Sequence, residues 1–262
     1  MSVLIAVPSK GRAARIATRS MRYLPDTGLD VRVFVEPQDA DAYRAVCDPQ
    51  IIVTLDDNDR GLGYVKCAIK AYAIAHDYRY IVKHDDDLQA WSDGVSAQAE
   101  NKRDSAQILR RAIDASVALM DSTARVDGVS FNYRAFMHVA DKDEWSFGQR
   151  LQTVYIVRRD SFYADTRVSV FEDLHNTLMI WLSGKHTARY NFAGMYMSGT
   201  KFAGIGSGGL QSNVFDRAAM AQDELMLMQR VYPALKFKRS ARHWGLEPDL
   251  KAARRDIFGM KR

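Results

Sequence analysis

The sequence is poor in cysteine and has none of the short cysteine or histidine patterns that mark common metal sites. Only 2 of its 262 residues are cysteine, and Cys47 and Cys67 form no Cys-x-x-Cys pattern. We therefore expect both thiols to be reduced and packed among apolar residues. The 6 histidines include no His-x-x-x-His pair, which argues against a helical zinc site of that kind.

Long apolar runs are also missing. No stretch approaches the roughly 20 apolar residues that a membrane-spanning helix requires, and residues 1–8 show a strand pattern rather than the basic stretch of a signal peptide. These absences predict a cytoplasmic protein without a membrane partner. A chain of 262 residues can bury a substantial core, and we expect a single domain, 1–262, built from two halves, 1–90 and 91–262.

The first half alternates strand and helix patterns. Apolar runs predict four strands, at residues 3–7, 31–35, 51–55 and 80–82. Helices are expected between them, and the one before the fourth strand has apolar residues at i, i+3, i+4 and i+7, namely Val65, Ala68, Ile69 and Tyr72. This alternation predicts an α/β fold with a mostly parallel sheet and helices on both faces. Ligands bind such sheets at the carboxyl ends of their strands.

The first strand ends in a turn with two cations. The turn reads Pro8-Ser9-Lys10-Gly11-Arg12 and offers backbone N–H groups, a hydroxyl and two positive charges. It has neither a Walker pattern nor a Gly-x-Gly-x-x-Gly. A strand, turn and helix in this order can nevertheless place a nucleotide at the carboxyl edge of a sheet.

Three acids follow the fourth strand without interruption, namely Asp85, Asp86 and Asp87. In extended geometry Asp85 and Asp87 point the same way, roughly 7 Å apart, and they repel each other by about 2 kcal/mol. A magnesium or manganese ion would relieve that repulsion and would favour a phosphorylated donor. An acidic turn without a function is the alternative.

The second half is less regular. Ser105 is expected to cap a helix with an apolar stripe at Leu109, Ile113, Val117 and Met120. Strands are expected at residues 128–133 and 153–157. The connection between these strands is either an acceptor-side loop or, as we favour, an exposed hairpin connection.

A second pair of acids, Glu172 and Asp173, precedes an apolar helix expected at residues 174–182. Acids in a first helical turn can satisfy free N–H groups and the helix dipole. A carboxylate held there can also act as a general base. The sequence alone leaves both interpretations open.

Two later segments carry further candidates. The glycine-rich stretch 199–209 contains Lys201, which could meet a diphosphate, although a plain surface loop fits the sequence equally well. His243, beside Trp244, is either a further ligand in a carboxylate site or a structural histidine.

The net charge is +5, and basic residues concentrate in the last quarter of the chain. Aromatic residues lie among these cations, which are Lys236, Lys238, Arg239, Arg242, Lys251, Arg254, Arg255, Lys261 and Arg262. The segment is either a surface that follows phosphates or a solvated helix face.

Together these landmarks resemble a GT-A glycosyltransferase of the family 2 type. In chain order they are Val7–Arg12, Glu36, Asp56-Asp57, His84–Asp87, Glu172-Asp173 and His243. The resemblance covers most of the chain. It implies a nucleotide-sugar donor, commonly UDP-linked, bound by residues 1–90, an acceptor bound by 91–262, and a Mn²⁺ or Mg²⁺ cofactor.

The resemblance also implies roles for individual residues. Asp173 would be the catalytic base, with Glu172 as its substitute. The metal would be held by Asp85, Asp87 and His243. The donor-binding residues would be Pro8, Ser9, Lys10, Arg12, Glu36, Asp57, Gly61, Asp85, Asp86 and Lys201.

Two departures from the family pattern narrow these expectations. The second strand ends in Glu36-Pro37 rather than Asp-Asp, which leaves the nucleoside contacts open. No Gln-x-x-Arg-Trp of the processive synthases is present, which favours a single transfer.

Within the superfamily the chain looks most like the TET-associated glycosyltransferases of phages. That resemblance implies sugar transfer to the hydroxymethyl group of a 5-hydroxymethylpyrimidine, such as 5-hydroxymethylcytosine, in DNA, in a bacterial or phage-infected cell. Three alternatives remain: a glycan or small-molecule acceptor, a metal-dependent nucleotidyltransferase, and a nucleic-acid-binding module without catalysis.

Overall fold

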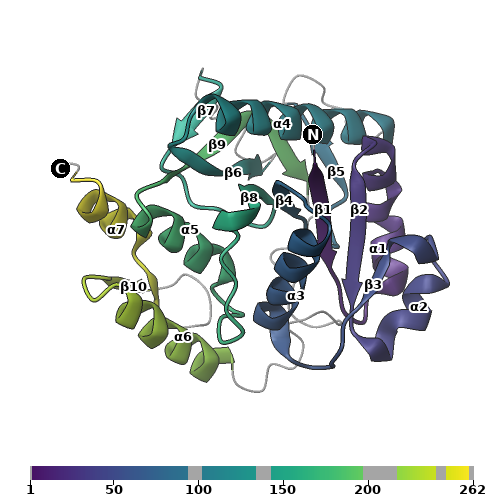
Figure 1. Cartoon of the computed structure of the whole chain (residues 1–262), viewed down its shortest axis with the longest axis horizontal. Coiled ribbons are helices and arrows are strands. Elements are labelled where there is room, and N and C mark those ends of the chain that lie inside the picture. The colour runs from purple at the N-terminus through teal and green to yellow at the C-terminus, as the bar shows by residue number, and fades with distance from the viewer. Residues whose placement is uncertain (1, 94–101, 134–142, 197–216, 240–245, 260–262) are drawn as a thin grey trace.

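The computed structural model of the chain describes residues 2–93, 102–133, 143–196, 217–239 and 246–259 (Figure 1). Within these residues the main sheet has nine strands, in the order β3-β2-β1-β4-β8-β6-β9-β5, with β7 paired to β9. The strands are β1 (Val3–Pro8), β2 (Asp30–Val35), β3 (Ile52–Thr54), β4 (Tyr80–Lys83), β5 (Ala90–Ser92), β6 (Val126–Tyr133), β7 (Trp145–Phe147), β8 (Tyr155–Arg158) and β9 (His186–Tyr196).

Helices cover both faces of this sheet. They are α1 (Ala13–Thr18), α2 (Ala40–Arg44), α3 (Gly61–Ala75), α4 (Lys102–Ser122), α5 (Glu172–Leu182), α6 (Arg217–Val231) and α7 (Leu250–Ile257). A separate two-stranded sheet joins β10 (Phe237–Arg239) to β11 (Leu246–Pro248). Figure 1 shows α6, β10 and α7 gathered near α5, at the opposite side of the molecule from α1 and α2.

The alternation of side chains along β1 divides the core in two. Val3, Ile5 and Val7 join a cluster with α1, α2 and α4, whereas Leu4 and Ala6 join a cluster with α3, α5, α6 and α7. A central strand must be apolar on both sides to be covered this way. The apolar run that predicted this strand is therefore explained by burial on both faces.

The predicted α/β class is confirmed, and β1 to β4 form the expected parallel unit. Beyond β4 the sheet becomes mixed, because β8 lies antiparallel between β4 and β6. Six strands, β1–β4, β6 and β9, share one direction, and β5, β7 and β8 run the other way.

Several local expectations need correction. Helix α4 begins at Lys102, so Ser105 does not cap it. Instead Ser105 is buried and accepts the backbone N–H of Trp91 at 3.1 Å. The buried stripe of α3 includes Lys66 and Ala73, while the expected Ala68 and Tyr72 are only half-buried.

The connection between β6 and β8 joins antiparallel neighbours, as in a hairpin, but it also contributes β7 to the sheet. Part of it, residues 134–142, lies outside the described residues. Cys47 and Cys67 are free thiols, as expected, and both are half-buried. None of the described helices combines the length and the apolar character needed to cross a membrane.

Candidate active site

The predicted donor and metal residues meet at one edge of the sheet. The carboxyl ends of β1, β2 and β4 lie there because these strands are parallel. Strand β8 runs the opposite way beside β4. The residues just before β8 therefore reach the same edge as the last residues of β4.

Asp86 ties the loop after β1 to the acidic turn after β4. Ser9 Oγ donates a 2.5 Å hydrogen bond to one oxygen of Asp86, and the Arg12 guanidinium lies 2.9 Å from the other. The Tyr43 hydroxyl lies 2.6 Å from Ser9 Oγ and accepts the Arg12 backbone N–H at 3.0 Å. Asp86 is buried, and these contacts hold the loop after β1 against the turn after β4.

The predicted nucleoside residues separate into a buried pair and an exposed acid. Lys10 lies 3.0 Å from the buried Glu36 and also pairs with Asp59. Glu36 in addition accepts the backbone N–H of Asp59 at 3.0 Å. Asp57 is exposed and pairs with Arg60 at 2.7 Å.

Pro8 and Gly61 occupy the borders of this edge. Pro8 is the buried last residue of β1 and pairs in register with Phe34 of β2. Gly61 begins α3 with φ +78°, and a Cβ there would lie 2.8 Å from Ser169 Oγ. The positive φ and the short distance to Ser169 both favour glycine at position 61.

Asp85 and Asp87 form the predicted metal pair. Both are half-buried, whereas Asp86 between them is buried toward Arg12. Burial raises the pKa of Asp85 to about 6 against the opposing effect of Lys83, and the charge of Asp87 adds to the increase. Lys83 pairs directly with Asp85, and Arg15 lies 3.7 Å from Asp87.

This donor set fits a divalent cation. Magnesium is usually held by one or two carboxylates together with water and substrate phosphates, and a cation would relieve the repulsion between Asp85 and Asp87. In the described part of the chain, no three or more His, Cys, Asp or Glu side chains are arranged to hold a metal. His243, the expected third ligand, and the expected donor residue Lys201 both lie outside the described residues.

The histidine in the acidic turn is structural. His84 is fully buried, its Nδ1 lies 2.7 Å from the Asp85 carbonyl oxygen, and its Nε2 lies 3.2 Å from the Tyr23 hydroxyl. Burial lowers the pKa of His84 to about 3. The ring is therefore neutral at physiological pH and supports the turn through hydrogen bonds.

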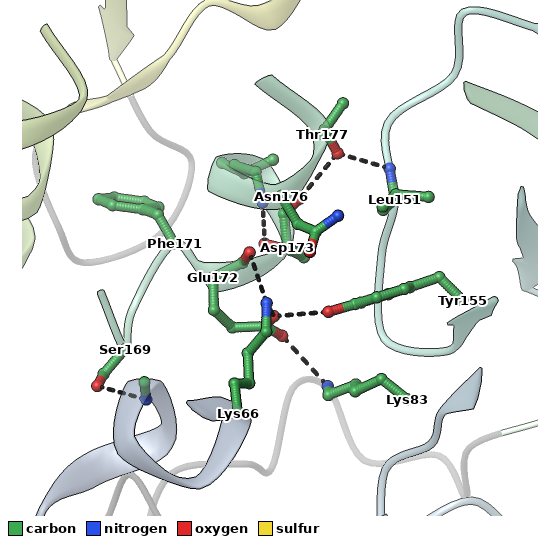
Figure 2. Close-up of polar contacts among 12 residues, drawn as sticks. Lys66, Lys83, Leu151, Tyr155, Ser169, Phe171, Glu172, Asp173, Asn176 and Thr177 are labelled. Carbon is green, nitrogen blue, oxygen red and sulfur yellow. Dashed lines mark hydrogen bonds and ion pairs between the residues drawn. The ribbon is translucent and has the colours of Figure 1, made fainter. Parts of the chain in front are cut away.

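Glu172, at the start of α5, is surrounded by partners (Figure 2). Lys66 Nζ lies 2.9 Å and Lys83 Nζ 3.3 Å from its carboxylate, and the Tyr155 hydroxyl donates to it at 3.0 Å. We call these three residues and Glu172 the glutamate cluster. Burial alone would raise the pKa of Glu172, but Lys66 and Lys83 lower it to about 2. Glu172 therefore stays ionised, and both of its carboxylate oxygens have partners.

Asp173, the next residue, has a different environment. One carboxylate oxygen accepts the backbone N–H of Leu174 at 2.8 Å, which is the helix-capping role considered for it. Among the described residues no hydrogen bond or ion pair reaches its other oxygen. Burial and the neighbouring charge of Glu172 raise the pKa of Asp173. A half-buried carboxylate with a raised pKa is suited to accept a proton.

Helix α6 holds the segment that leads into α5. The two carboxylate oxygens of Glu224 accept the backbone N–H groups of Ser169, Val170 and Phe171 at 2.7–3.0 Å. Glu224 is itself buried. The position of Asp173 thus depends on a side chain more than 50 residues away in sequence.

Seven of the predicted residues fall into three contact groups, and Pro8, Asp57, Gly61, Asp87 and Asp173 lie outside these groups. Ser9, Arg12 and Asp86 form one, and Lys10 with Glu36 forms another. Lys83 creates the third, because its ammonium group contacts both Asp85 and Glu172. Its third partner, the carbonyl oxygen of Thr153 at 3.1 Å, comes from the chain just before β8.

Four residues of this site were not predicted: Lys66, Lys83, Tyr155 and Glu224. Two of them leave a signal in the sequence. Lys83 extends an apolar strand, and Lys66 lies on the apolar stripe of α3. A lysine on a buried surface requires an acidic partner, but its identity depends on the tertiary fold. We find no comparable signal for Tyr155 or Glu224.

The chain is similar in structure to nucleotide-sugar enzymes. Glucosyl-3-phosphoglycerate synthase from Mycobacterium tuberculosis, in complex with Mn²⁺ and uridine-diphosphate-glucose, has a TM-score of 0.53 at 12% identity, covering 97% of this chain and 91% of that one. Its complex with Mn²⁺, uridine-diphosphate and glucosyl-3-phosphoglycerate has a TM-score of 0.51 at 13% identity, with 97% and 92% covered. At these identities the likeness shows the shared GT-A fold.

Three further comparisons were made. S. aureus TarS 1–349 has a TM-score of 0.47 at 14% identity, and the match spans 75% of this chain but only 60% of that chain. No curated protein matches the sequence. The model of the TET-Associated Glycosyltransferase family matches residues 3–205, well over half of the chain. The protein therefore belongs to the TET-associated glycosyltransferase family.

Proposed function

We propose that this glycosyltransferase moves a sugar from a UDP-sugar to the hydroxymethyl group of a 5-hydroxymethylpyrimidine in DNA. Asp173 is the catalytic base, and Asp85 and Asp87 hold a divalent cation, Mn²⁺ or Mg²⁺. A UDP-sugar is supported by the similar fold of a synthase crystallised with Mn²⁺ and UDP-glucose. A DNA acceptor is supported by the family resemblance and by the basic C-terminal segment.

One observation carries this proposal. The ammonium group of Lys83 contacts Asp85 on the donor side and lies 3.3 Å from Glu172, the neighbour of Asp173. Lys83 thereby joins a proposed metal ligand to the residue next to the proposed base, at the carboxyl edge of the sheet. A transferase needs this arrangement, because the leaving group and the attacking hydroxyl must both be held in place.

The donor side is prepared by the loop after β1. Arg12, fixed by Asp86, and Lys10, fixed by Glu36, place two cations at the edge where the diphosphate would bind. When bound, the divalent cation supplies charge compensation for the departing diphosphate. Because ion pairs already hold Arg12 and Lys10 in place, these side chains need little reorganisation as negative charge develops on the departing diphosphate.

The acceptor side depends on Asp173. Its raised pKa makes it a better proton acceptor than an ordinary aspartate. As the acceptor oxygen bonds to the anomeric carbon, the bond from that carbon to the diphosphate oxygen breaks, and the hydroxyl proton passes to Asp173. Glu172 keeps its ion pairs with Lys66 and Lys83 and holds the start of α5.

The test combines donor, cation and acceptor. The protein is incubated with a panel of UDP-sugars, Mn²⁺ and DNA containing 5-hydroxymethylcytosine or 5-hydroxymethyluracil, and the digested nucleosides are weighed by mass spectrometry. A hexose addition is expected. Asp173→Asn should lower the transfer rate by about 10²–10⁴-fold and leave UDP binding unchanged.

Other outcomes would point elsewhere. Nucleotide addition instead of hexose addition would show a nucleotidyltransferase. Transfer to free glycans or small molecules but not to DNA would contradict the acceptor. If Asp173→Asn kept full activity while Glu172→Gln lost it, Asp173 would not be the base.

A further inference from the structure

The positive charge of the protein is concentrated beyond the family match, which ends at residue 205. Residues 236–262 contain nine lysines and arginines and three acids, a net charge of +6. Since the whole chain carries +5, the other residues together carry −1. The excess positive charge therefore belongs to one local segment.

The three acids of this segment have structural partners. Glu247 lies 3.3 Å from Lys238 across the β10–β11 pair. Asp249 caps α7 by accepting the Ala252 N–H at 3.0 Å. Asp256 accepts a hydrogen bond from Tyr232. Among the described cations of the segment, only Lys238 forms an ion pair with one of these acids, Glu247.

Four cations make up what we call the C-terminal basic surface, namely Lys236, Arg239, Lys251 and Arg255. The first three are exposed and Arg255 is half-buried. The Lys236 carbonyl oxygen accepts the Asp249 N–H at 2.8 Å, which brings β10 beside the first turn of α7. Lys251 and Arg255, four residues apart, lie on one face of α7, opposite the buried stripe.

This surface is anchored to the helix that carries the base. Helix α7 packs on α5, where the rings of Phe258 and Trp181 lie 6.2 Å apart. Arg254 fixes the same helix by donating to the Gly148 carbonyl oxygen at 2.8 Å. Helix α5 has 11 residues, so its length is about 16 Å. Trp181 follows Asp173 by eight residues, so the anchor lies about 12 Å from the base along the helix axis.

We propose that the C-terminal basic surface binds the phosphate backbone of the acceptor DNA, flanking the nucleotide presented to Asp173. This inference rests on the proposed function. Duplex DNA has one phosphate for about every 1.7 Å of its axis. The distance of about 12 Å between Asp173 and the anchor at Trp181 therefore corresponds to several phosphates. Enzymes that modify a base in a duplex must also take it out of the stack, and contacts to flanking phosphates would hold the duplex while this happens.

The surface makes a quantitative prediction about salt. Each cation that contacts a phosphate contributes about 0.9 to the slope of log affinity against log salt concentration. Neutralising four such cations should reduce the magnitude of that slope by about 3.6. At low salt the affinity for DNA should fall at least tenfold.

The experiment compares two fourfold variants with the wild-type protein. The first carries K236Q, R239Q, K251Q and R255Q, and the second neutralises four exposed arginines outside the C-terminal basic surface through R22Q, R44Q, R79Q and R125Q. Affinity for a duplex containing 5-hydroxymethylcytosine is measured by fluorescence anisotropy across salt concentrations. UDP binding and thermal unfolding are measured as checks on the donor site and the fold.

The expected result is a reduced slope and affinity for the first variant alone, with UDP binding unchanged. Equal losses in both variants would overturn the proposal, because net charge would then explain them. If the protein transfers sugar to DNA but the first variant keeps the wild-type salt slope, the proposed role of the C-terminal basic surface is overturned. The proposed function then stands. A selective slope change without transfer from any UDP-sugar would instead overturn the proposed function and leave the surface standing.

Discussion

At the residue scale, two adjacent acids are held in opposite electrostatic conditions. Lys66 and Lys83 lower the pKa of Glu172 to about 2, while burial and Glu172 itself raise the pKa of Asp173. Neighbouring titratable groups whose pKa values are pushed apart commonly divide their roles. The proposed mechanism follows this division, with Glu172 as the supporting residue and Asp173 as the base.

This division predicts a shift in the pH dependence of transfer. With Asp173 as the proposed base, activity should require its ionised form and should fall as the pH drops through its pKa. Glu172→Gln removes a negative neighbour and leaves two lysines nearby, so the acidic limb of kcat should move to lower pH. The same change should reduce the free energy of unfolding by about 3 kcal/mol, because it breaks buried ion pairs.

A matched control is Tyr155→Phe, which removes a hydrogen bond to Glu172 but no charge. Its acidic limb should stay near that of the wild-type protein. The measurement is kcat against pH at saturating donor, with thermal unfolding followed in parallel. An acidic limb that stays in place in Glu172→Gln would contradict the electrostatic coupling of the two acids.

The candidate acids could be selected from sequence for two different reasons. Asp85 and Asp87 follow an apolar strand, whereas Glu172 and Asp173 open an apolar helix and follow no strand in the structure. Lys66, separated from Glu172 by more than 100 residues, could not be paired from sequence. Such contacts depend on how α3 and α5 pack, which periodicity does not determine.

At the element scale, α3 and the segment before α5 approach closely at Gly63. A Cβ at this position would lie 2.4 Å from the Asp165 carbonyl oxygen and 2.5 Å from that of Val168. The Gly63 N–H also donates to Ser169 Oγ at 3.1 Å. The glycine therefore allows α3 to lie directly against the backbone that leads to Glu172.

Gly63→Ala should destabilise the protein, although alanine is normally about 1 kcal/mol better than glycine inside a helix. The clash is with backbone atoms, which cannot rotate away, so we expect a loss of at least about 2 kcal/mol. Chemical denaturation measures the change. The exposed helix position Ala71 provides the comparison, since Ala71→Gly should cost about 1 kcal/mol.

A Gly63→Ala protein as stable as the wild type would show that α3 and residues 165–168 can separate freely. A loss in transfer rate larger than the loss in stability would show that the packing also positions α5. Both quantities come from the same purified variant, measured by transfer assay and denaturation.

Prediction of the main-sheet strands succeeded for β1 to β4 and failed for β5, β7 and β9. The first strands are apolar runs buried on both faces, which a sequence displays directly. Strand β9 contains charged, polar and aromatic residues, and its pairing with β6 shifts register twice. Its identity as a strand comes from its neighbours in the sheet, so no local pattern reveals it.

At the scale of the whole molecule, the active edge combines groups from distant parts of the chain. The loop after β1 and the acidic turn after β4 belong to residues 1–90, whereas Glu172 and Asp173 come from the second half. Lys83 and Lys66 make ion pairs that cross this boundary. Ligands at this edge should therefore stabilise the molecule as a whole.

Mn²⁺ with UDP should raise the thermal midpoint of the wild-type protein. At one hundred times the dissociation constant, the gain is about 2.7 kcal/mol, or about 5 °C for a chain of this size. Asp87→Asn should lose most of this shift, because it removes a proposed metal ligand. Differential scanning fluorimetry measures both proteins.

The control for this measurement is Asp41→Asn, whose carboxylate is exposed and pairs only with Arg44 among the described residues. It should keep the full shift. An Asp87→Asn protein that responds to Mn²⁺ and UDP as strongly as the control would remove Asp87 from the cation site.

Strand β8 runs antiparallel to β4, and the chain that leads into it carries an unusual backbone conformation at Thr153. This residue has φ +41°, a conformation that is costly for a β-branched side chain. Its carbonyl oxygen accepts Lys83 at 3.1 Å, and its hydroxyl bonds to Tyr133. An energetically unfavourable backbone geometry thus persists just before β8, where the Thr153 carbonyl oxygen contacts the ammonium group of Lys83. Replacing this threonine would disturb the contacts of Lys83 with Asp85 and Glu172 without altering any charged group.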